Sequence, residues 1–307
     1  MKYLFNICLL AGLCFTACKK DLTTDAPTAG INLNNARSSI GDTLVFKLGD
    51  TCKFSLDGYA DNIAFWAGTV GNKYEFRDRV MALGVPTLSF TSTAQFGTQT
   101  NTLQVLATNK LPSRDSATVV NAAWTNITAR TPLATSATAV NTGNVNLSDL
   151  VNGINDSLFI AFKYSGITGS TQRTWTITNY TVNNVLADYS YNLGSLVNDN
   201  AYWTRYGNVW NPATARWVPT TTALTIIGGT ATSPSNTSWI ISKALYVGRV
   251  SPDISTATVK NITASATTAY AYKYGAVGKY KATFVSYNVN PNELKNSIVA
   301  FNIKVIQ

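Results

Sequence analysis

Short runs in which apolar and polar residues alternate, separated by Gly, Asn and Asp, cover most of the chain. Alternation with a period of two places the apolar side chains on one face of a strand. No long stretch keeps the 3.6-residue period of an amphipathic helix, and the strand formers Thr, Val, Ile, Tyr, Phe and Trp are abundant. The pattern therefore predicts an all-β protein built from β-sandwiches.

The two ends of the chain carry the clearest strand patterns, and each is too short to fold alone. Residues 49–79 and 270–305 each contain only a few strands, so neither can bury enough apolar surface for independent stability. We predict that residues 36–80 and 269–307 form one discontinuous sandwich. In that arrangement the strands at 51–56 and 63–66 share a core with those at 279–287 and 298–305.

The intervening residues 81–268 are then an inserted domain, which a surface loop tolerates when its two ends lie close together. Polar turns separate its strand-like runs, a spacing that favours a sandwich or jelly roll. Strands are expected at 87–91, 102–108, 117–124, 157–164, 173–182, 223–227 and 238–247.

The first residues have the pattern of an export signal. Lys2 precedes an apolar run that is too short to span a bilayer, so residues 1–17 are predicted to be a signal peptide. The sequence Phe15-Thr16-Ala17-Cys18 resembles a bacterial lipobox, in which the cysteine is lipidated after cleavage. Residues 18–35 would then be a lipidated Cys18 and a polar tether, and the protein would be anchored in the outer membrane at the cell surface.

Charge and rare residues narrow the function. The net charge of +9 comes from scattered Lys and Arg without a basic stripe, so nucleic acid is not an expected partner, although acidic glycans remain an alternative. The chain has no His, which removes the usual general base and zinc ligand. Cys52 lies on the same strand face as Phe54 and Leu56, and is predicted to be a core thiol without catalytic function.

Acidic residues do not form a convincing catalytic pair. Asp57 and Asp61 lie in turn contexts, and Glu75 and Asp78 have the pattern of exposed charges beside arginines. Glycosidases need two carboxyl groups at a set separation, which these residues do not indicate. We therefore predict a protein that is not an enzyme.

The best candidate for ligand binding is a long aromatic loop at residues 186–219, because ordinary loops are rarely so long or so aromatic. Flat aromatic rings stack on the apolar faces of sugars, and neighbouring Asn and Arg side chains can bond to hydroxyl groups. The alternative is that these rings fill the core of the inserted domain. The candidate glycan-binding residues are Tyr202, Trp203, Arg205, Tyr206, Asn208, Trp210 and Trp217.

Two resemblances agree with this organisation. The closing segment, with Tyr274, Gly278, Tyr280, Thr283 and Phe284, resembles the end of a PKD-like, immunoglobulin-type domain. Phrases along the mature chain, such as residues 61–68, 74–79, 160–164 and 173–177, resemble an uncharacterised domain family of Bacteroidetes lipoproteins. Its members often lie beside polysaccharide-utilisation genes, and the family implies no established activity. The middle phrases are also similar to jelly rolls of the galactose-binding-like type.

These observations lead to three hypotheses. The first is a cell-surface lipoprotein that binds a polysaccharide or oligosaccharide without catalysis, next to an outer-membrane receptor and transporter pair. The second is a structural or adhesive protein that binds other proteins, and the third is a carbohydrate-active enzyme. No cofactor is expected, although similar jelly rolls imply that a structural calcium is an open alternative.

Overall fold

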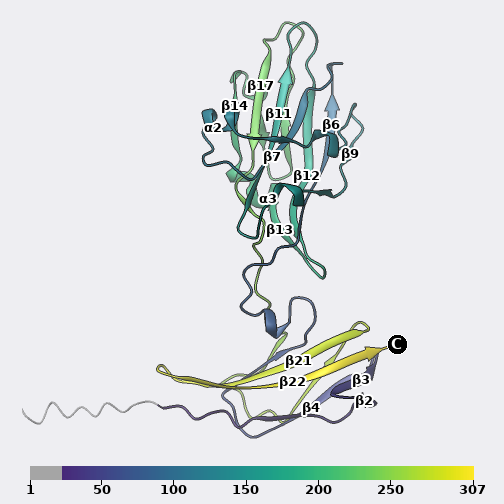
Figure 1. The fold of residues 1–307 in the computed structure, drawn as a ribbon, viewed down its shortest axis with the longest axis vertical. Coiled ribbons are helices and arrows are strands. Elements are labelled where there is room, and N and C mark those ends of the chain that lie inside the picture. Colours follow the sequence, from purple (N-terminus) through teal and green to yellow (C-terminus); the bar gives the residue numbers. More distant parts are fainter. Residues whose placement is uncertain (1–22) are drawn as a thin grey trace, which may run out of the picture. The chain divides into compact units, whose positions relative to one another are not determined.

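The computed structural model describes residues 23–307, and its chain divides into two compact units (Figure 1). The first unit combines the chain up to Arg77 with Asp253–Gln307, and the second is Asp78–Pro252. Both are built from β-sheets that enclose an apolar core, and the strand pairs are antiparallel except for β22 (Leu294–Ile306) with β3 (Thr43–Lys47), which is parallel. The predicted all-β class of β-sandwiches is therefore confirmed. No helix within residues 23–307 is long and apolar enough to cross a membrane.

The first unit is a sandwich of a six-stranded and a three-stranded sheet. The larger sheet has the order β19 (Ala257–Lys260), β5 (Asn62–Trp66), β21 (Gly278–Val289), β22 (Leu294–Ile306), β3 (Thr43–Lys47) and β2 (Ser38–Ile40). The smaller sheet has the order β1 (Gly30–Leu33), β4 (Thr51–Asp57) and β20 (Ala269–Lys273). A single 3-10 turn, η2 (Tyr74–Phe76), precedes the junction with the second unit.

Strands from both ends of the chain meet in this core. Phe65 on β5 lies opposite Phe284 on β21, and their ring centroids are 4.8 Å apart. Phe54 on β4 reaches across from the smaller sheet, with its ring 4.8 Å from that of Phe284. The alternating Ile303 and Val305 of β22 complete the same cluster. All four segments that the sequence pattern paired therefore contribute side chains to one core.

Two segments differ from the sequence interpretation. Residues 30–33 were expected to belong to a polar tether, but they form β1, in which Ile31 and Leu33 are buried against β4. Residues 257–260 were placed in the insertion, but they form β19, which pairs with β5 of the first sandwich. The predicted signal segment 1–17 and Cys18 lie outside the described residues.

The second unit is a sandwich of a seven-stranded and a six-stranded sheet. The seven-stranded sheet has the order β10 (Val145–Asn146), β6 (Val85–Gln95), β12 (Thr174–Val185), β16 (Ala223–Ile226) and β15 (Val218–Pro219), with β13 (Ser190–Ser195) on β12 and β9 (Val140–Asn141) on β6. The six-stranded sheet has the order β14 (Thr204–Gly207), β17 (Asn236–Ile241), β11 (Ser157–Gly166), β7 (Leu103–Thr108) and β8 (Thr125–Asn126), with β18 (Leu245–Tyr246) on β11. The successive pairs β6–β7, β11–β12 and β16–β17 each pass from one sheet to the other, so the chain wraps one shared core.

A helix replaces one predicted strand in this unit. Residues 117–124, expected to be a strand, contain the helix α2 (Ser116–Asn121). The Asp115 side chain caps it by accepting a hydrogen bond from the backbone N–H of Thr118 at 2.9 Å. Val119 is buried in a cluster with Phe159 and Trp239 of the six-stranded sheet. Capping and this burial outweigh the strand propensity of the Thr-Val-Val run.

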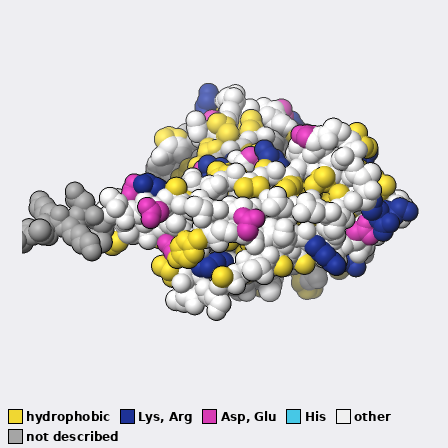
Figure 2. Space-filling view, turned by 90° about the horizontal axis from the view of Figure 1, so that it is seen from below, with side chains coloured by type: hydrophobic (Ala, Val, Ile, Leu, Met, Phe, Trp, Pro, Cys, Tyr) yellow, Lys and Arg dark blue, Asp and Glu magenta, His cyan; other side chains and the backbone are white. Residues whose placement is uncertain are grey.

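Charged side chains are sparse on the surface. On the face drawn in Figure 2, lysines, arginines and acids lie scattered among uncharged side chains, and neither sign forms a continuous block. Short-range partners therefore decide the electrostatics of a site on this face.

The thiol of Cys52 is predicted to be unreactive in the folded protein. Its side chain is fully buried, and this burial raises the pKa of the Cys52 thiol to about 12. In a variant that begins at Lys19, Cys52 is the only cysteine. Iodoacetamide at pH 8 should label it at least about 1,000-fold more slowly in the native protein than in urea, because labelling requires unfolding. Comparable rates in both conditions would contradict the buried position.

The aromatic core predicts a large effect for Phe284→Ala. Phe284 contacts Phe54, Phe65 and Tyr270, so truncation should lower the free energy of unfolding of the first sandwich by about 3–5 kcal/mol. The urea dependence of Cys52 labelling measures this unit alone. Leu294→Ala, on an exposed position of β22, is the matched control and should change stability by less than about 0.5 kcal/mol. Equal effects of the two variants would show that the shared core does not hold this unit together.

Candidate functional site

The residues of the aromatic loop do not form one ligand-binding surface. Trp217 is fully buried, and its indole N–H donates a hydrogen bond to the carbonyl oxygen of Ser238 at 3.2 Å. Trp203 is 8% exposed and packs edge-on against the ring of Tyr180. Both indoles belong to the main core of the second sandwich, as in the alternative that these rings fill the core of the inserted domain. Their rings are therefore not available to stack on a ligand.

Three other loop candidates brace the structure. Tyr206 on β14 packs against the cluster around Trp239, and its hydroxyl donates a hydrogen bond to the carbonyl oxygen of Arg114. The guanidinium of Arg205 donates to the carbonyl oxygen of Trp217 at 3.0 Å. Asn208 accepts from the backbone N–H of Thr237 and donates to the carbonyl oxygen of Ser235. These side chains fix the course of the loop against β17.

The two remaining candidates are exposed but belong to different places. Trp210 is 45% exposed and stacks with the guanidinium of Arg216, whose centre is 4.6 Å from the indole ring. Tyr202 is 56% exposed, and the ammonium group of Lys243 lies 5.7 Å from its ring. Lys243 also lines a pocket that the sequence analysis did not identify. That pocket is the strongest candidate site. Tyr202 does not line it, but its ring lies next to the lining residue Lys243.

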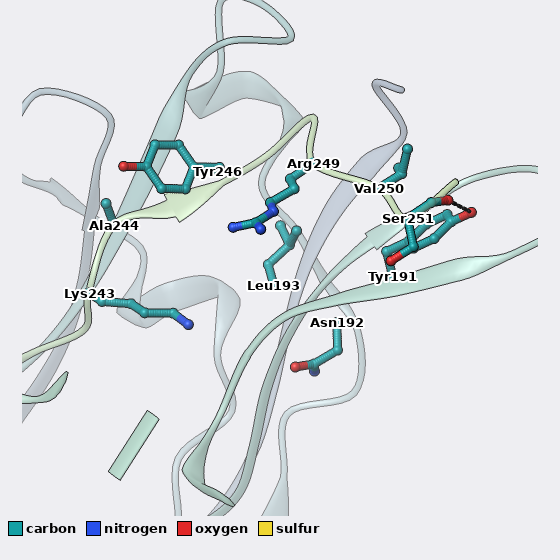
Figure 3. Close-up of a pocket in the computed structure, with 9 residues that line it drawn as sticks. All are labelled: Tyr191, Asn192, Leu193, Lys243, Ala244, Tyr246, Arg249, Val250 and Ser251. Carbon is teal, nitrogen blue, oxygen red and sulfur yellow. Dashed lines mark hydrogen bonds between the residues drawn. The ribbon is translucent and has the colours of Figure 1, made fainter. Parts of the chain in front are cut away.

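The pocket has a volume of about 340 Å³ and is shown in Figure 3. Two segments of the second sandwich form it, the strand β13 and the segment around β18. The side chains of Lys243 and Arg249 point into the same space from opposite sides. The lining residues are Tyr191, Asn192, Leu193, Lys243, Ala244, Tyr246, Arg249, Val250 and Ser251.

An irregularity in β13 shapes one wall. Asn192 pairs with Asn183 and Gly194 pairs with Val182, so Leu193 is an extra residue without a partner on β12. Such a bulge turns side chains away from their regular alternation and is frequent beside binding sites. The amide of Asn192 is held by donating hydrogen bonds to the Asn183 side chain and to the Gly194 carbonyl oxygen. The bulge thus carries Asn192 and Leu193 to the pocket.

A tight turn after β18 shapes the opposite wall. The N–H of Arg249 donates to the carbonyl oxygen of Tyr246 at 3.1 Å, which closes the turn. Gly248 is required in it, because a Cβ atom at this position would lie 2.2 Å from the carbonyl oxygen of Ile154. Val247 is buried beneath the turn. Tyr246 and Arg249 are therefore both presented outwards on a backbone that cannot easily shift.

The two cations of the pocket are held differently. The ammonium of Lys243 lies 2.6 Å from a carboxylate oxygen of Asp199, whose side chain is only 3% exposed. The other oxygen of Asp199 accepts the backbone N–H of Ser195 at 2.8 Å, so one oxygen faces a cation and the other a backbone donor. The guanidinium of Arg249 is exposed and has no hydrogen-bond, ion-pair or ring partner among residues 23–307. Lys243 is thus held by the protein, whereas the donors of the Arg249 guanidinium are unengaged within residues 23–307.

Tyrosines supply the aromatic part of the pocket. Tyr246 is 55% exposed. The hydroxyl of Tyr191 donates to the carbonyl oxygen of Ser251 at 3.4 Å and accepts from the guanidinium of Arg79 at 3.2 Å. The ring of Tyr189 packs edge-on against that of Tyr191, with centroids 4.7 Å apart. Tyr191 is therefore held in place, and Tyr246 offers an open ring.

The lining residues of this pocket are mainly cationic, aromatic, amide and apolar. None of its lining residues is Asp, Glu, Cys or Ser with a neighbouring base, so it offers neither an acid pair nor an activated nucleophile. Of the acids considered above, Asp61 accepts a hydrogen bond from the Tyr59 hydroxyl at 2.6 Å in the first sandwich. Within residues 23–307, no group of three His, Cys, Asp or Glu side chains is placed to hold a metal ion.

A shallower second hollow, of about 270 Å³, lies on the outer face of the first sandwich. Trp66, Tyr74, Arg77, Tyr287 and Leu294 are among its lining residues. Trp66 is only 9% exposed because Tyr74 packs edge-on against it, and the Arg77 guanidinium covers the Tyr74 ring at 4.2 Å. These rings are largely occupied by one another, which makes this hollow the weaker candidate.

The sequence did carry a signal for the missed residues. In residues 245–250 the buried Leu245, Val247 and Val250 leave Tyr246 and Arg249 on the exposed side, next to a glycine. The run was interpreted as one strand extending from 238 to 247. An exposed aromatic followed by a glycine turn is the feature that distinguishes it from a core strand.

Fold and site together define a two-sandwich protein with a cationic and aromatic pocket on its second unit. A family model for a domain of unknown function, DUF5017, matches residues 17–202, which is more than half of the chain. The protein therefore belongs to this family. The match takes in β13 with Tyr191 and Asn192 and ends before β18 with Tyr246 and Arg249. No curated protein and no solved structure matches the chain.

The different settings of the two cations predict different effects on stability. Lys243→Met leaves the Asp199 carboxylate buried without its counter-ion and should lower the free energy of unfolding of the second sandwich by about 1–3 kcal/mol. Arg249→Gln should change it by less than about 0.5 kcal/mol. Tryptophan fluorescence in urea measures this unit, which contains six of the seven tryptophans. Equal losses would show that Arg249 also has a structural role.

Proposed function

We propose that this protein is a cell-surface lipoprotein that binds a glycan without altering it and so supports the capture of polysaccharide. The observation that carries the proposal is the pocket in which the open ring of Tyr246, the Asn192 amide and two cations line one space without a carboxylate. Aromatic rings cover the apolar faces of sugars, while amide oxygens and cationic donors bind their hydroxyl groups. A volume of about 340 Å³ falls in the size range of small-ligand sites.

The many hydroxyl groups of a glycan also suit the polar side chains of this pocket. Sugar hydroxyls need several weak partners, and the pocket offers the side-chain oxygen of Asn192 as an acceptor together with the Arg249 guanidinium and the Tyr246 hydroxyl. The bulge in β13 and the Gly248 turn fix the backbone that carries these groups, so the backbone loses little entropy on binding. The missing acid pair supports binding rather than hydrolysis.

The location in the proposal comes from the sequence. The signal segment and the lipobox-like Cys18 support anchorage in the outer membrane, as does the resemblance to lipoproteins found beside polysaccharide-utilisation genes. In this proposal the partners are the membrane, the polysaccharide and an outer-membrane receptor and transporter pair. The inserted sandwich presents the pocket, and the discontinuous sandwich carries it.

Replacement of the open ring is the direct test of the pocket. Tyr246→Ala should weaken binding of a glycan ligand by about fivefold, because a stacked aromatic contact contributes on the order of 1 kcal/mol. A panel of neutral and acidic polysaccharides in affinity electrophoresis identifies the ligand, and calorimetry with its oligosaccharide gives the affinity.

Trp210→Ala is the matched control, since this exposed ring lies in the same sandwich outside the pocket. Loss of affinity in this variant with full binding by Tyr246→Ala would transfer the site to the aromatic loop. Absence of binding across the panel would refute the proposed function, and release of reducing sugar by the wild type would refute its non-catalytic part.

A further inference from the structure

We infer that the pocket selects glycans that carry an anionic group, a carboxylate or a sulfate, and that Arg249 binds this group. The inference rests on the proposed function and names the class of sugar that the pocket takes. It follows from how the charges of the pocket are balanced within the second sandwich.

Arg249 differs from every other arginine of the chain. The guanidinium groups of the other eight contact a carboxylate, a carbonyl or hydroxyl oxygen or an aromatic ring of the protein, or have another partner in the described structure. Arg249 alone has none among residues 23–307. Exposed arginines are often simply solvated, but this one points into a pocket rather than away from the surface (Figure 3). Its five N–H donors suit a planar, doubly accepting group such as a carboxylate.

Lys243 adds a second positive charge that attracts an anionic ligand, while Arg249 remains the group that binds it. Asp199 occupies one side of its ammonium group, which fixes the position of the lysine and offsets its charge. An ammonium has three N–H donors, so donors remain for a ligand. The lining residues include two cations and no acid, which leaves the pocket without a carboxylate of its own facing Arg249. A neutral sugar would leave this cation without a counter-charge, whereas an anionic sugar would supply one.

Apolar and aromatic side chains surround the Arg249 guanidinium in the pocket. Leu193 and Val250 form apolar walls beside Arg249, and Tyr246 lies on the same turn. A charge-assisted hydrogen bond from the Arg249 guanidinium is stronger than a neutral one, and because Arg249 is exposed this attraction is screened by salt. The sugar ring can rest against Tyr246 while its acidic substituent reaches Arg249. The geometry thus joins ring stacking and anion binding in one site.

The test compares polymers that share a backbone and either carry the anionic group or lack it. Calorimetry on the full chain in detergent uses polygalacturonate against its methyl ester for the carboxylate, and dextran sulfate against dextran for the sulfate. We expect at least about tenfold tighter binding of the charged member in one of the two pairs, weakening as NaCl rises. The pair that shows the preference identifies the anionic group.

Variants locate the source of the preference. Arg249→Gln should remove the preference, so that the charged member binds no more tightly than the neutral member, whereas Arg249→Lys should keep part of it. Arg216→Gln removes the same charge from the same sandwich outside the pocket and should keep all of it. Equal losses in Arg216→Gln and Arg249→Gln would show diffuse attraction to the basic protein and overturn the inference.

The two proposals fail in different ways. Binding of neutral polysaccharide through Tyr246 with no charge preference would overturn the inference and leave the proposed function intact. A wild type that binds no polysaccharide of either pair or of the wider panel would overturn both.

Discussion

The pairing of β5 with β21 is the contact on which the architecture depends. It brings residues near the start of the chain beside residues near its end, with Phe65 opposite Phe284. Neither segment has a core of its own, so each strand is stabilised only when the distant one is in place. The loop-closure entropy of so long a separation grows only slowly with length, and the aromatic cluster around Phe54 offsets it.

This constraint explains how a second sandwich can be inserted. In the first unit, the N–H of Asp253 donates to the carbonyl oxygen of Phe76 at 3.1 Å, so the outgoing and returning chains lie side by side. In the second unit, the N–H of Val250 donates in the same way to the carbonyl oxygen of Val80. In each sandwich, the two chain ends that lead to the other sandwich therefore lie close together. The apolar core of each sandwich is complete without residues of the other.

The sequence predicted the class, the shared core of the two ends and most strands, because alternation reports directly which residues face a core. It was less successful where tertiary contacts override local pattern. Residues 30–33 are short and flanked by polar residues, so only the pairing of Ile31 with Leu56 on β4 reveals a strand. The Thr-Val-Val run of α2 has the composition of a strand, and the cap at Asp115 decides against it.

The candidate site was less predictable for a related reason. Aromatic residues mark both cores and binding surfaces, so the density of rings in the loop did not distinguish Trp217 in the core from an exposed ring. The pocket is formed by residues about fifty positions apart, and it depends on a bulge at Leu193 whose register no local pattern specifies.

The two cations of the pocket differ in how far the fold depends on their side chains. Lys243 forms an ion pair with the nearly buried carboxylate of Asp199, so replacing Lys243 destabilises the fold. Arg249 stands on a turn whose shape is set by Gly248 and Val247 beneath it, so its side chain carries no part of that structure. A position that is rigid in its backbone and unengaged in its side chain can change its ligand by substitution while the fold stays intact. In the function proposed here, the specificity of the pocket is therefore set more by the residue at 249 than by the residue at 243.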